Sequence, residues 1–272
     1  MIDGHTKIYG LLGRPVAHSL SPAMHNAAFR ELGLNAVYVA FAVTDLVRAV
    51  AGLRGLRIAG VSVTIPFKEE IIPLLDELDP KAARMAAVNT VVNREGLLAG
   101  YNTDWLGAVA ALKDKTAIAG ENFLILGAGG ASRAIVFGLL EEGGSVAITD
   151  LDAERAQTLA TQFRVAALPL AELDRHPGGV LINATPVGME PCAGALPIEA
   201  DLLGRFRLVM DIVYRPLETK LLKEARARGA ATIDGLQMLI HQGAAQFELF
   251  TGRPAPVAVM SRVAYAALGE AR

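Results

Sequence analysis

The sequence predicts an α/β fold built on parallel sheets, and three observations support this. A short apolar run at 123–126 leads into the glycine-rich turn Gly127-Ala128-Gly129-Gly130, and an apolar helical pattern begins near Ala134. Residues 208–213 are apolar almost without interruption, as in a parallel strand that is covered on both faces. Strand and helix patterns also alternate through residues 8–64, which is typical of parallel α/β units.

The glycine-rich turn is typical of a dinucleotide-binding site. Gly127 allows the tight turn, and Gly129 lets backbone N–H groups at the start of the next helix approach a pyrophosphate. The third fingerprint position is Ser132 rather than glycine, but Asp150 follows the next apolar run about 20 residues on, where an acid can bind ribose hydroxyls. The alternative is an ordinary βαβ unit whose glycines only make a turn.

Composition excludes several classes of protein. The chain has 272 residues, enough for one large or two ordinary domains, and 52% of them are apolar, so disorder is not expected. A net charge of −2 without a basic run gives no sign of a nucleic-acid surface. Cys192 is the single cysteine and the five histidines are scattered, so neither a disulfide nor a metal site is expected. No signal-peptide pattern or membrane-length apolar run occurs, and we expect a cytoplasmic protein.

The first hundred residues carry two candidate site residues. Ser21, followed by Pro22, reads as the N-cap of a helix, and Ser19 lies before the cap, where a hydroxyl can face a ligand. Lys68 follows a predicted strand directly, at the edge where open α/β sheets bind ligands, and a lysine there can transfer protons; the alternative is a surface lysine beginning a helix. The predicted strands are 8–13, 36–43, 58–64, 88–92 and 96–99, and the predicted helices are 21–32, 46–53 and 69–78.

The remaining chain continues the alternation. Thr103 and Asp104 are good cap residues for a helix over 105–112, although Asp104 could instead pair with Lys68 and tune it. The polar stretch 113–122 suits a crossing between domains. Thr185 begins a loop at the carboxyl edge of a strand, where a nicotinamide would lie. Further strands are predicted at 145–149, 180–184, 208–213 and 231–234, and further helices at 153–162, 219–228, 237–250 and 257–268.

Several separated strings together resemble the shikimate dehydrogenase family over nearly the whole chain. Each string is weak alone, but their joint order is highly specific. The strings are Ser19-Leu20-Ser21-Pro22, Val63-Thr64-Ile65-Pro66-Phe67-Lys68, Asn89-Thr90, Gly100-Tyr101-Asn102-Thr103-Asp104, Gly127-Ala128-Gly129-Gly130-Ala131-Ser132-Arg133, Asn183-Ala184-Thr185-Pro186-Val187-Gly188-Met189, Asp234-Gly235 and His241-Gln242-Gly243-Ala244-Ala245-Gln246-Phe247.

The resemblance implies reversible reduction of 3-dehydroshikimate to shikimate, a step in making aromatic amino acids. It implies that Lys68 and Asp104 are the catalytic pair, with Lys68 donating a proton to the carbonyl oxygen and Asp104 holding the lysine and contacting a substrate hydroxyl. The other matching substrate contacts are Ser19, Ser21, Thr64, Asn89, Tyr214 and Gln242. The matching cofactor contacts are Gly127, Ala128, Gly129, Gly130, Ala131, Asp150, Arg155, Thr185, Ile212, Gly235 and Met238.

The resemblance also implies two lobes with a cleft between them. The first is an α/β substrate-binding domain formed by residues 1–103 and 240–272, to which the last helices return. The second is a Rossmann-like parallel-sheet dinucleotide domain over residues 104–239. We expect small-molecule partners only, in a monomer or homodimer.

The sequence departs from the family where the adenosine ribose would bind. Many members use NADP and carry Asn-Arg-Thr at the end of the second nucleotide strand, whereas this chain has Asp150-Leu151-Asp152. A carboxylate there favours ribose hydroxyls and repels a 2′-phosphate, so we expect a preference for NAD. Arg155 is retained and could still support some use of NADP.

Two alternatives accompany this expectation. An acid at this strand end also occurs in NAD-dependent quinate/shikimate dehydrogenases of quinate catabolism, although Ser21 rather than threonine favours shikimate. A non-catalytic dinucleotide-binding regulator would most simply lack Lys68 or Asp104, and both are present. A short-chain dehydrogenase would need Tyr-x-x-x-Lys and a zinc dehydrogenase would need thiolate and imidazole ligands, so both classes are set aside.

Overall fold

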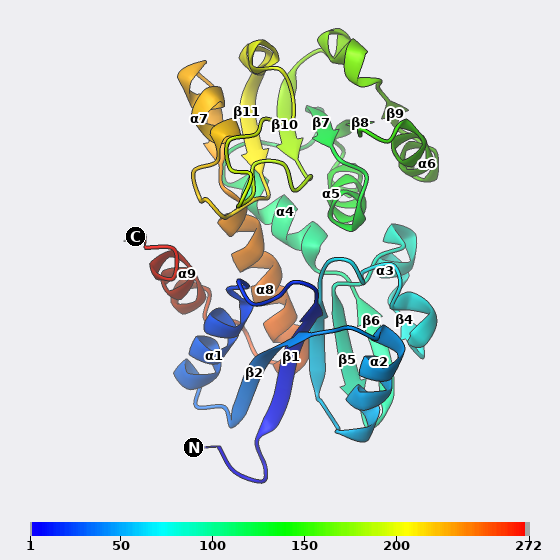
Figure 1. Ribbon diagram of the computed structural model, residues 1–272, viewed down its shortest axis with the longest axis vertical. Helices are drawn as coiled ribbons and strands as arrows, with labels where there is room; N and C mark the ends of the chain where they lie inside the picture. The colour runs from blue at the N-terminus through cyan, green and yellow to red at the C-terminus, as the bar shows by residue number, and fades with distance from the viewer. Residues whose placement is uncertain (1, 270–272) are drawn as a thin grey trace. The chain divides into compact units, whose positions relative to one another are not determined.

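The computed structural model describes residues 2–269, and the chain divides into two compact units. Unit 1 combines the chain up to Thr103 with the chain from Ile240 onward, and unit 2 is Asp104–Leu239. Figure 1 shows the course of the chain, with the two segments of unit 1 in blue to cyan and in orange to red.

The helices and strands alternate along most of the chain. The elements of unit 1 are β1 (Lys7–Gly13), α1 (Ser21–Glu31), β2 (Ala36–Ala42), α2 (Leu46–Gly55), β3 (Gly60–Val63), β4 (Glu77–Leu78), α3 (Pro80–Met85), β5 (Thr90–Arg94), β6 (Leu97–Tyr101) and α9 (Val257–Ala266). The elements of unit 2 are α4 (Asp104–Lys113), β7 (Asn122–Leu126), α5 (Gly130–Glu141), β8 (Ser145–Thr149), α6 (Ala153–Phe163), β9 (Ala166–Ala167), β10 (Gly179–Asn183), β11 (Phe206–Asp211), α7 (Lys220–Ala227) and β12 (Ala231–Ile233). Helix α8 (Gly235–Thr251) begins in unit 2 and continues into unit 1.

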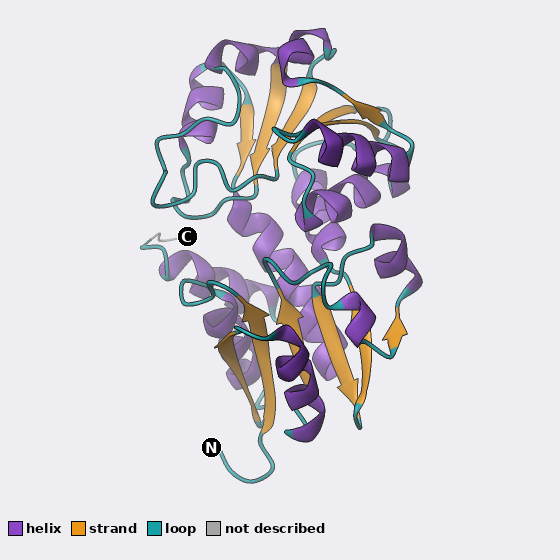
Figure 2. Ribbon diagram, turned by 45° about the vertical axis from the view of Figure 1, so that its right-hand side comes forward, coloured by secondary structure: helices purple, strands orange, loops and turns teal. Residues whose placement is uncertain are grey.

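Unit 1 contains a mixed six-stranded sheet in the order β2-β1-β3-β5-β6-β4. Strands β1, β2 and β3 are parallel, whereas β5 runs antiparallel to both β3 and β6. The first part of the chain therefore forms the expected parallel α/β units, and the strands predicted at 88–92 and 96–99 form an antiparallel hairpin, β5 and β6, that extends their sheet. Figure 2 shows the strands of this sheet in orange among the helices that cover them.

Alternation along the strands of unit 1 gives the sheet two buried faces. On one face, Leu12 of β1 and Val61 of β3 pack with Leu53 of α2 in a hydrophobic cluster. On the other face, the ring of Tyr9 on β1 contacts Phe29 of α1 and Phe250 of α8, with ring centroids 5.4 and 5.0 Å apart. The Tyr9 hydroxyl also donates a hydrogen bond to the Phe250 carbonyl (2.9 Å), which ties the two sequence segments of unit 1 together.

Unit 2 contains a fully parallel six-stranded sheet in the order β12-β11-β10-β7-β8-β9. Numbered along the chain from β7, this is the 3-2-1-4-5-6 order of doubly wound dinucleotide-binding folds, with the switch point between β7 and β10. Ile125 of β7 packs with Ile135 of α5 on one face, and Leu124 packs with Leu221 of α7 on the other. The sheet is therefore covered on both faces, as the apolar strand at 208–213 predicts.

The predicted helix over 69–78 is wrong. This segment forms a single 3₁₀ turn (Ile72–Leu74) followed by the short strand β4. Pro73 has no N–H to donate, and its ring would clash with the preceding turn of an α-helix. The Asp76 carboxylate then accepts hydrogen bonds from the Leu98 N–H (2.7 Å) and the Arg54 guanidinium (2.7 Å), which holds β4 beside β6.

The predicted N-cap of α1 is also wrong by one position. Helix α1 begins at Ser21 itself, with Leu20 as its cap residue, and the Ser21 N–H donates to the Ser19 hydroxyl (3.2 Å). Ser19 therefore does the local capping that Ser21 was expected to do.

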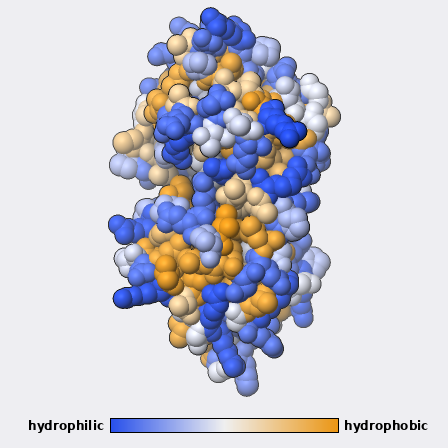
Figure 3. Space-filling view, turned by 90° about the vertical axis from the view of Figure 1, so that its right-hand side faces the viewer, coloured by the Kyte–Doolittle hydropathy of each residue, from blue (hydrophilic) through white to orange (hydrophobic). Residues whose placement is uncertain are grey.

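The surface shows no membrane-spanning feature among the residues described. Within 2–269 no helix has both the length and the apolar character needed to cross a bilayer. On the face drawn in Figure 3, hydrophobic residues form a broad patch in the lower part of the view, and smaller hydrophobic groups lie among hydrophilic residues elsewhere.

Candidate active site

Lys68 lies in the turn segment that follows the carboxyl end of β3, five residues after Val63, and it is half-buried. The backbone fixes its place, because its carbonyl accepts a hydrogen bond from the Val88 N–H (2.8 Å) and Phe67 donates to the Thr64 carbonyl (2.9 Å). Thr64 is close to Gly13 of β1: a Cβ on Gly13 would lie 2.3 Å from the Thr64 Cγ2 atom. Only glycine allows this approach, and it brings the carboxyl ends of β1 and β3 together.

Asn89, Thr103 and Gln242 form a buried hydrogen-bonded cluster in unit 1, with Asn89 2% and Gln242 8% exposed. The Asn89 Nδ2 donates to Thr103 Oγ1 (3.0 Å) and to Gln242 Oε1 (3.3 Å), and the Thr103 N–H donates to Asn89 Oδ1 (2.8 Å). Two predicted substrate residues, Asn89 directly before β5 and Gln242 on α8, are therefore in direct contact. Asp104 follows Thr103 in the chain and is the first residue of α4, buried at 5% exposure.

Sequence reasoning missed the polar side chains behind this cluster. Thr90 is fully buried and donates to Asn89 Oδ1 (2.6 Å), and Gln246 donates to the Asn89 carbonyl (3.0 Å). One signal was available, because Gln246 stands four residues after Gln242 on α8 and such residues share a helix face.

The glycine-rich turn of unit 2 links β7 to α5 as predicted. Gly127 has a φ of +103°, which favours glycine, and a Cβ there would lie 3.0 Å from the Thr185 Cγ2 atom. Gly129 is the N-cap residue of α5 and supplies no side chain to cap it. The backbone N–H groups of Gly130 and Ala131 therefore stand at the start of a 12-residue helix, where an anion is favourable.

Asp150 and Arg155 both approach this turn. Asp150 Oδ2 accepts a hydrogen bond from the Ala128 N–H (2.7 Å), and Oδ1 accepts one from the Asp152 N–H (2.9 Å). A Cβ built on Gly129 would meet only the Arg155 guanidinium, at 4.0 Å. One carboxylate and one cation thus lie against the same turn.

The loops after β10 and β11 are joined by a buried carboxylate. Asp211 Oδ1 accepts from Asn183 Nδ2 (2.9 Å) and from the Val213 N–H (3.0 Å), and Oδ2 accepts from the Thr219 hydroxyl (2.7 Å). Burial raises the pKa of Asp211 to about 6, and these hydrogen bonds oppose the rise. Asn183 Oδ1 in turn accepts from the Thr185 N–H (3.1 Å) and hydroxyl (2.7 Å). The predicted nicotinamide loop is therefore fixed by polar residues that the sequence analysis left unassigned.

The remaining predicted residues of unit 2 lie around the end of β11. Gly235 begins α8 against Ile212, since a Cβ there would lie 2.4 Å from the Ile212 carbonyl oxygen. Met238 is 6% exposed and packs in the hydrophobic core of unit 2. Tyr214 follows β11 and belongs to unit 2, unlike most of the predicted substrate residues, and burial raises its pKa.

The residues of unit 2 fit a dinucleotide. The tight turn at Gly127, the uncapped N-terminus of α5 and the open space above Gly129 form a place that a pyrophosphate can enter. Asp150 offers a carboxylate to ribose hydroxyls at the end of β8. Within the described chain, no three His, Cys, Asp or Glu side chains gather in a way that could hold a metal ion.

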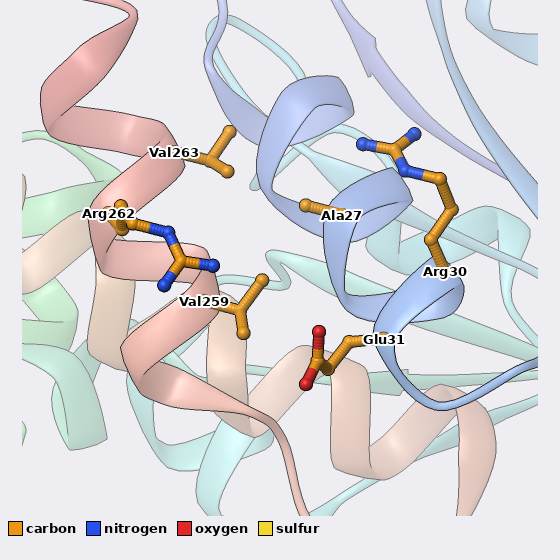
Figure 4. Close-up of a pocket in the computed structure, with 6 residues that line it drawn as sticks. All are labelled: Ala27, Arg30, Glu31, Val259, Arg262 and Val263. Atoms are coloured by element: carbon orange, nitrogen blue, oxygen red, sulfur yellow. The ribbon is translucent and has the colours of Figure 1, made fainter.

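A surface cavity of about 280 Å³ lies elsewhere in unit 1, between α1 and α9. Figure 4 shows the side chains of Arg30 and Glu31 from α1 and of Arg262 from α9 around it. None of the predicted site residues lines this cavity, so it is separate from the candidate active site.

Comparisons with known proteins find matches to one family along most of the chain. Residues 11–91 match the family described as the shikimate dehydrogenase substrate binding domain, and residues 235–265 match the shikimate 5′-dehydrogenase C-terminal domain. A shikimate dehydrogenase (NADP(+)) of Pyrococcus furiosus is 48% identical over 273 residues, covering 99% of each chain.

Two solved structures share the fold over nearly their full lengths. The shikimate 5-dehydrogenase of Thermus thermophilus, in complex with NADP(H) and shikimate, has a TM-score of 0.89 and 41% identity, with 97% of this chain and 100% of that chain covered. The quinate dehydrogenase of Corynebacterium glutamicum, in complex with NAD, has a TM-score of 0.88 and 33% identity, with coverage of 96% and 99%.

Proposed function

Since the chain belongs to the shikimate dehydrogenase family, we propose that it reversibly reduces 3-dehydroshikimate to shikimate with a nicotinamide dinucleotide. The observation that carries this proposal is the Asn89, Thr103 and Gln242 cluster, which unit 1 builds from separate segments. Its neutral amide and hydroxyl groups suit the hydroxyls of the substrate ring, which both donate and accept hydrogen bonds.

Lys68 is the proton donor in this proposal. A dinucleotide held by unit 2 would supply the hydride for reduction and accept it in oxidation. Addition of hydride to the carbonyl carbon leaves negative charge on the substrate's oxygen. A positioned ammonium group can donate its proton to that oxygen, and the neutral amine takes the proton back in the oxidation direction. The half-buried position of Lys68 after β3 supports this role.

Asp104 is the proposed partner of this chemistry. Its backbone directly follows Thr103, which Asn89 holds by hydrogen bonds in both directions. In this proposal the Asp104 carboxylate orients the Lys68 ammonium and accepts a hydrogen bond from a substrate hydroxyl. Thr64, directly after β3, and Ser19 and Ser21, at the start of α1, are proposed to offer hydroxyls to the substrate, and Tyr214 of unit 2 is a further proposed substrate residue.

The dinucleotide would be held by the glycine-rich turn, Thr185, Ile212 and Gly235 of unit 2. We assign a preference for NAD, because Asp150 already binds the Ala128 N–H of that turn. A 2′-phosphate at the end of β8 would approach this carboxylate, and like charges repel. Arg155 supports some use of NADP, because its guanidinium also lies against the turn.

Quinate oxidation is the second candidate. Its support is the fold shared with a quinate dehydrogenase that was solved with NAD, together with Asp150. Quinate carries one more hydroxyl beside its carboxylate, so the Ser19 and Ser21 region would decide between the two acids. Shikimate remains the first candidate because the high-identity relative is a shikimate dehydrogenase.

Initial rates with shikimate and with quinate, each against NAD and NADP, test the proposal. We expect the highest kcat/KM for shikimate with NAD. A higher kcat/KM with NADP would be consistent with the proposed reaction but would contradict the NAD preference that we assign to Asp150. A faster rate with quinate would move the enzyme to quinate oxidation, and no rate with any pair in protein that binds NAD would contradict an enzymatic role.

Replacing Asp150 tests the cofactor assignment directly. Asp150→Ala removes the repelling carboxylate, so the ratio of kcat/KM for NADP to that for NAD should rise by on the order of tenfold. Asp114→Ala, at an exposed position in the same unit, is the matched control. An unchanged ratio in Asp150→Ala would contradict the assignment.

A further inference from the structure

A chain of buried hydrogen bonds in unit 1 continues behind the proposed substrate residues. The Tyr38 hydroxyl donates to Ser62 Oγ (2.6 Å), and Ser62 donates to Gln246 Oε1 (2.6 Å). Gln246 Nε2 then donates to Thr90 Oγ1 (3.0 Å), and Thr90 donates to Asn89 Oδ1 (2.6 Å). The chain thus crosses from β2 through β3 and α8 to β5 and ends on the Asn89 side chain.

The polarity of this chain is set by backbone groups. The Asn89 carbonyl oxygen can only accept, so the end of the Gln246 amide that faces it, at 3.0 Å, must be Nε2. Oε1 then faces Ser62, which must donate its proton to that oxygen. Thr90 Oγ1 accepts a hydrogen bond from Gln246 Nε2, so the Thr90 hydroxyl donates its own hydrogen bond to Asn89 Oδ1.

A second backbone group confirms the orientation of the Asn89 amide from the other side. The Thr103 N–H can only donate, and it points at Asn89 Oδ1 (2.8 Å). With Oδ1 held by the Thr103 N–H and the Thr90 hydroxyl, Nδ2 is directed to Gln242 Oε1 and Thr103 Oγ1, and the Thr103 hydroxyl also lies 3.3 Å from Oδ1. The amide therefore has one orientation, with its N–H₂ end on the side of the proposed substrate residues.

We infer that Gln246 and Thr90 are positioning residues for substrate binding: they fix the Asn89 amide with its N–H₂ end toward Gln242 and Thr103, so that an N–H now bonded to one of these residues can turn to a ring oxygen of the substrate. This inference rests on the proposed function, in which Asn89 binds substrate. Gln246 is 1% and Thr90 0% exposed, and both hydrogen-bond to Asn89, so in this inference they act through that residue.

The end of this hydrogen-bond chain that is farthest from Asn89, the Tyr38 side chain, is held by packing. The imidazole of His25 stacks on the Tyr38 ring with centroids 4.4 Å apart and an interplanar angle of 4°. Burial lowers the pKa of His25 to about 3, so the stacked ring is neutral near pH 7. Burial raises the pKa of Tyr38, and hydrogen bonds with Ser62 and Ser21 oppose this rise. Tyr38 therefore keeps its proton and remains a hydrogen-bond donor. Its interaction with Ser21 also links the start of α1 to this chain of hydrogen bonds.

The hydroxyl of Thr90 provides a matched pair of variants. Thr90→Val keeps the shape and removes the donor to Asn89 Oδ1, whereas Thr90→Ser keeps the hydroxyl. In Thr90→Val we expect KM for shikimate to rise roughly tenfold, the effect of one misdirected hydrogen bond, with KM for the dinucleotide unchanged. Thr90→Ser should restore most of the loss. Equal losses in both variants would mean that packing alone matters and would overturn the inference.

Gln246→Glu tests the polarity of the chain. A carboxylate at position 246 can only accept hydrogen bonds, so the Thr90 hydroxyl donates to it instead of to Asn89 Oδ1. The backbone carbonyl of Asn89 then faces a second acceptor in place of a donor. We expect a larger rise in KM for shikimate than in Thr90→Val, again without a change for the dinucleotide. Gln157→Glu, at an exposed position on α6, is the matched control. A wild-type KM in folded Gln246→Glu would overturn the inference.

The amide of Asn89 can also be observed without any reaction. In ligand-free protein, the Asn89 side-chain N–H₂ pair should give distinct ¹H–¹⁵N NMR signals that shift in Thr90→Val and return in Thr90→Ser. Asn89→Ala assigns the signals. If these signals respond but Asn89→Ala leaves the KM for shikimate unchanged, the substrate role of Asn89 fails while the positioning stands. Signals unmoved in Thr90→Val would overturn the positioning itself.

Discussion

Asn183 donates a hydrogen bond of 2.9 Å to the carboxylate of Asp211, and the two residues are paired partners at the carboxyl ends of β10 and β11. The carboxylate is fully buried and receives donors from three directions. It holds together two loops of unit 2, and it does so at the cost of burying a charge.

We expect Asp211 to make unit 2 more stable as the pH falls. Burial raises its pKa from 3.8 to about 6, so the folded protein binds a proton more tightly than the unfolded chain. Its contribution is therefore least favourable above pH 6 and improves between pH 6 and pH 4, by about 3 kcal/mol in total. Asp211→Asn removes this titration, and urea denaturation at pH 4.5 and pH 7 should show it. An identical pH dependence in the two proteins would contradict the prediction.

His25 should act in the opposite direction. Burial lowers its pKa to about 3 from 6.5, so the unfolded chain binds the proton more tightly, and the stability contribution is lost as the pH falls from 6.5 towards 3. His25→Phe keeps a ring to stack on Tyr38 and removes the titration. The acid-induced loss of unfolding free energy should therefore be smaller in this variant. His5→Phe, at an exposed position, is the control, and a wild-type acid profile in His25→Phe would exclude this role.

Lys68→Ala should lower kcat for shikimate oxidation by roughly 10²–10⁴-fold, the usual contribution of general acid–base catalysis. Because Lys68 belongs to unit 1 and the dinucleotide is assigned to unit 2, the dissociation constant for NAD should stay within about twofold. Stopped-flow rates and NAD titration measure the two quantities. Activity surviving in Lys68→Ala would show that another group transfers the proton.

Gly235→Ala should destabilise the protein, because the new Cβ would lie 2.4 Å from the Ile212 carbonyl oxygen and backbone must move. A cost of about 1–3 kcal/mol is typical of such overpacking. Gly194→Ala, whose Cβ would meet nothing within 4 Å, is the matched control. Equal unfolding free energies for the two variants, measured in urea, would contradict the close approach.

The sequence predicts most of the fold because strand ends and glycine turns are local signals. The turn from Gly127 to Gly130 and the apolar run at 208–213 each report their structure within a few residues. The error at 69–78 has a different origin, since its apolar spacing suits a helix while Pro73 and the contact of Asp76 with Leu98 oppose one. The second of these depends on a strand that the local pattern does not reveal.

The candidate site was predictable only in part, for a related reason. Asp150 directly follows β8 and Lys68 lies in the segment after β3, and ligands gather beyond strand ends in such folds, so position along the chain was enough to select both residues. Gln246 and Ser62 meet only after α8 packs against the sheet of unit 1, and neither residue type is distinctive alone. Buried polar networks depend on contacts between distant segments, which periodicity does not report.

The division of unit 1 into two segments has a consequence for synthesis in the cell. A ribosome completes all of unit 2 before it reaches Ile240, while the earlier part of unit 1 still lacks Gln242, Gln246 and Phe250. During that interval the Asn89 amide has no α8 partner and the face of the sheet around Tyr9 lacks part of its cover. Nascent chains that have residue 239 outside the ribosomal tunnel, with the residues after it still inside, should therefore have a folded dinucleotide unit, and bind NAD, before the substrate site is complete.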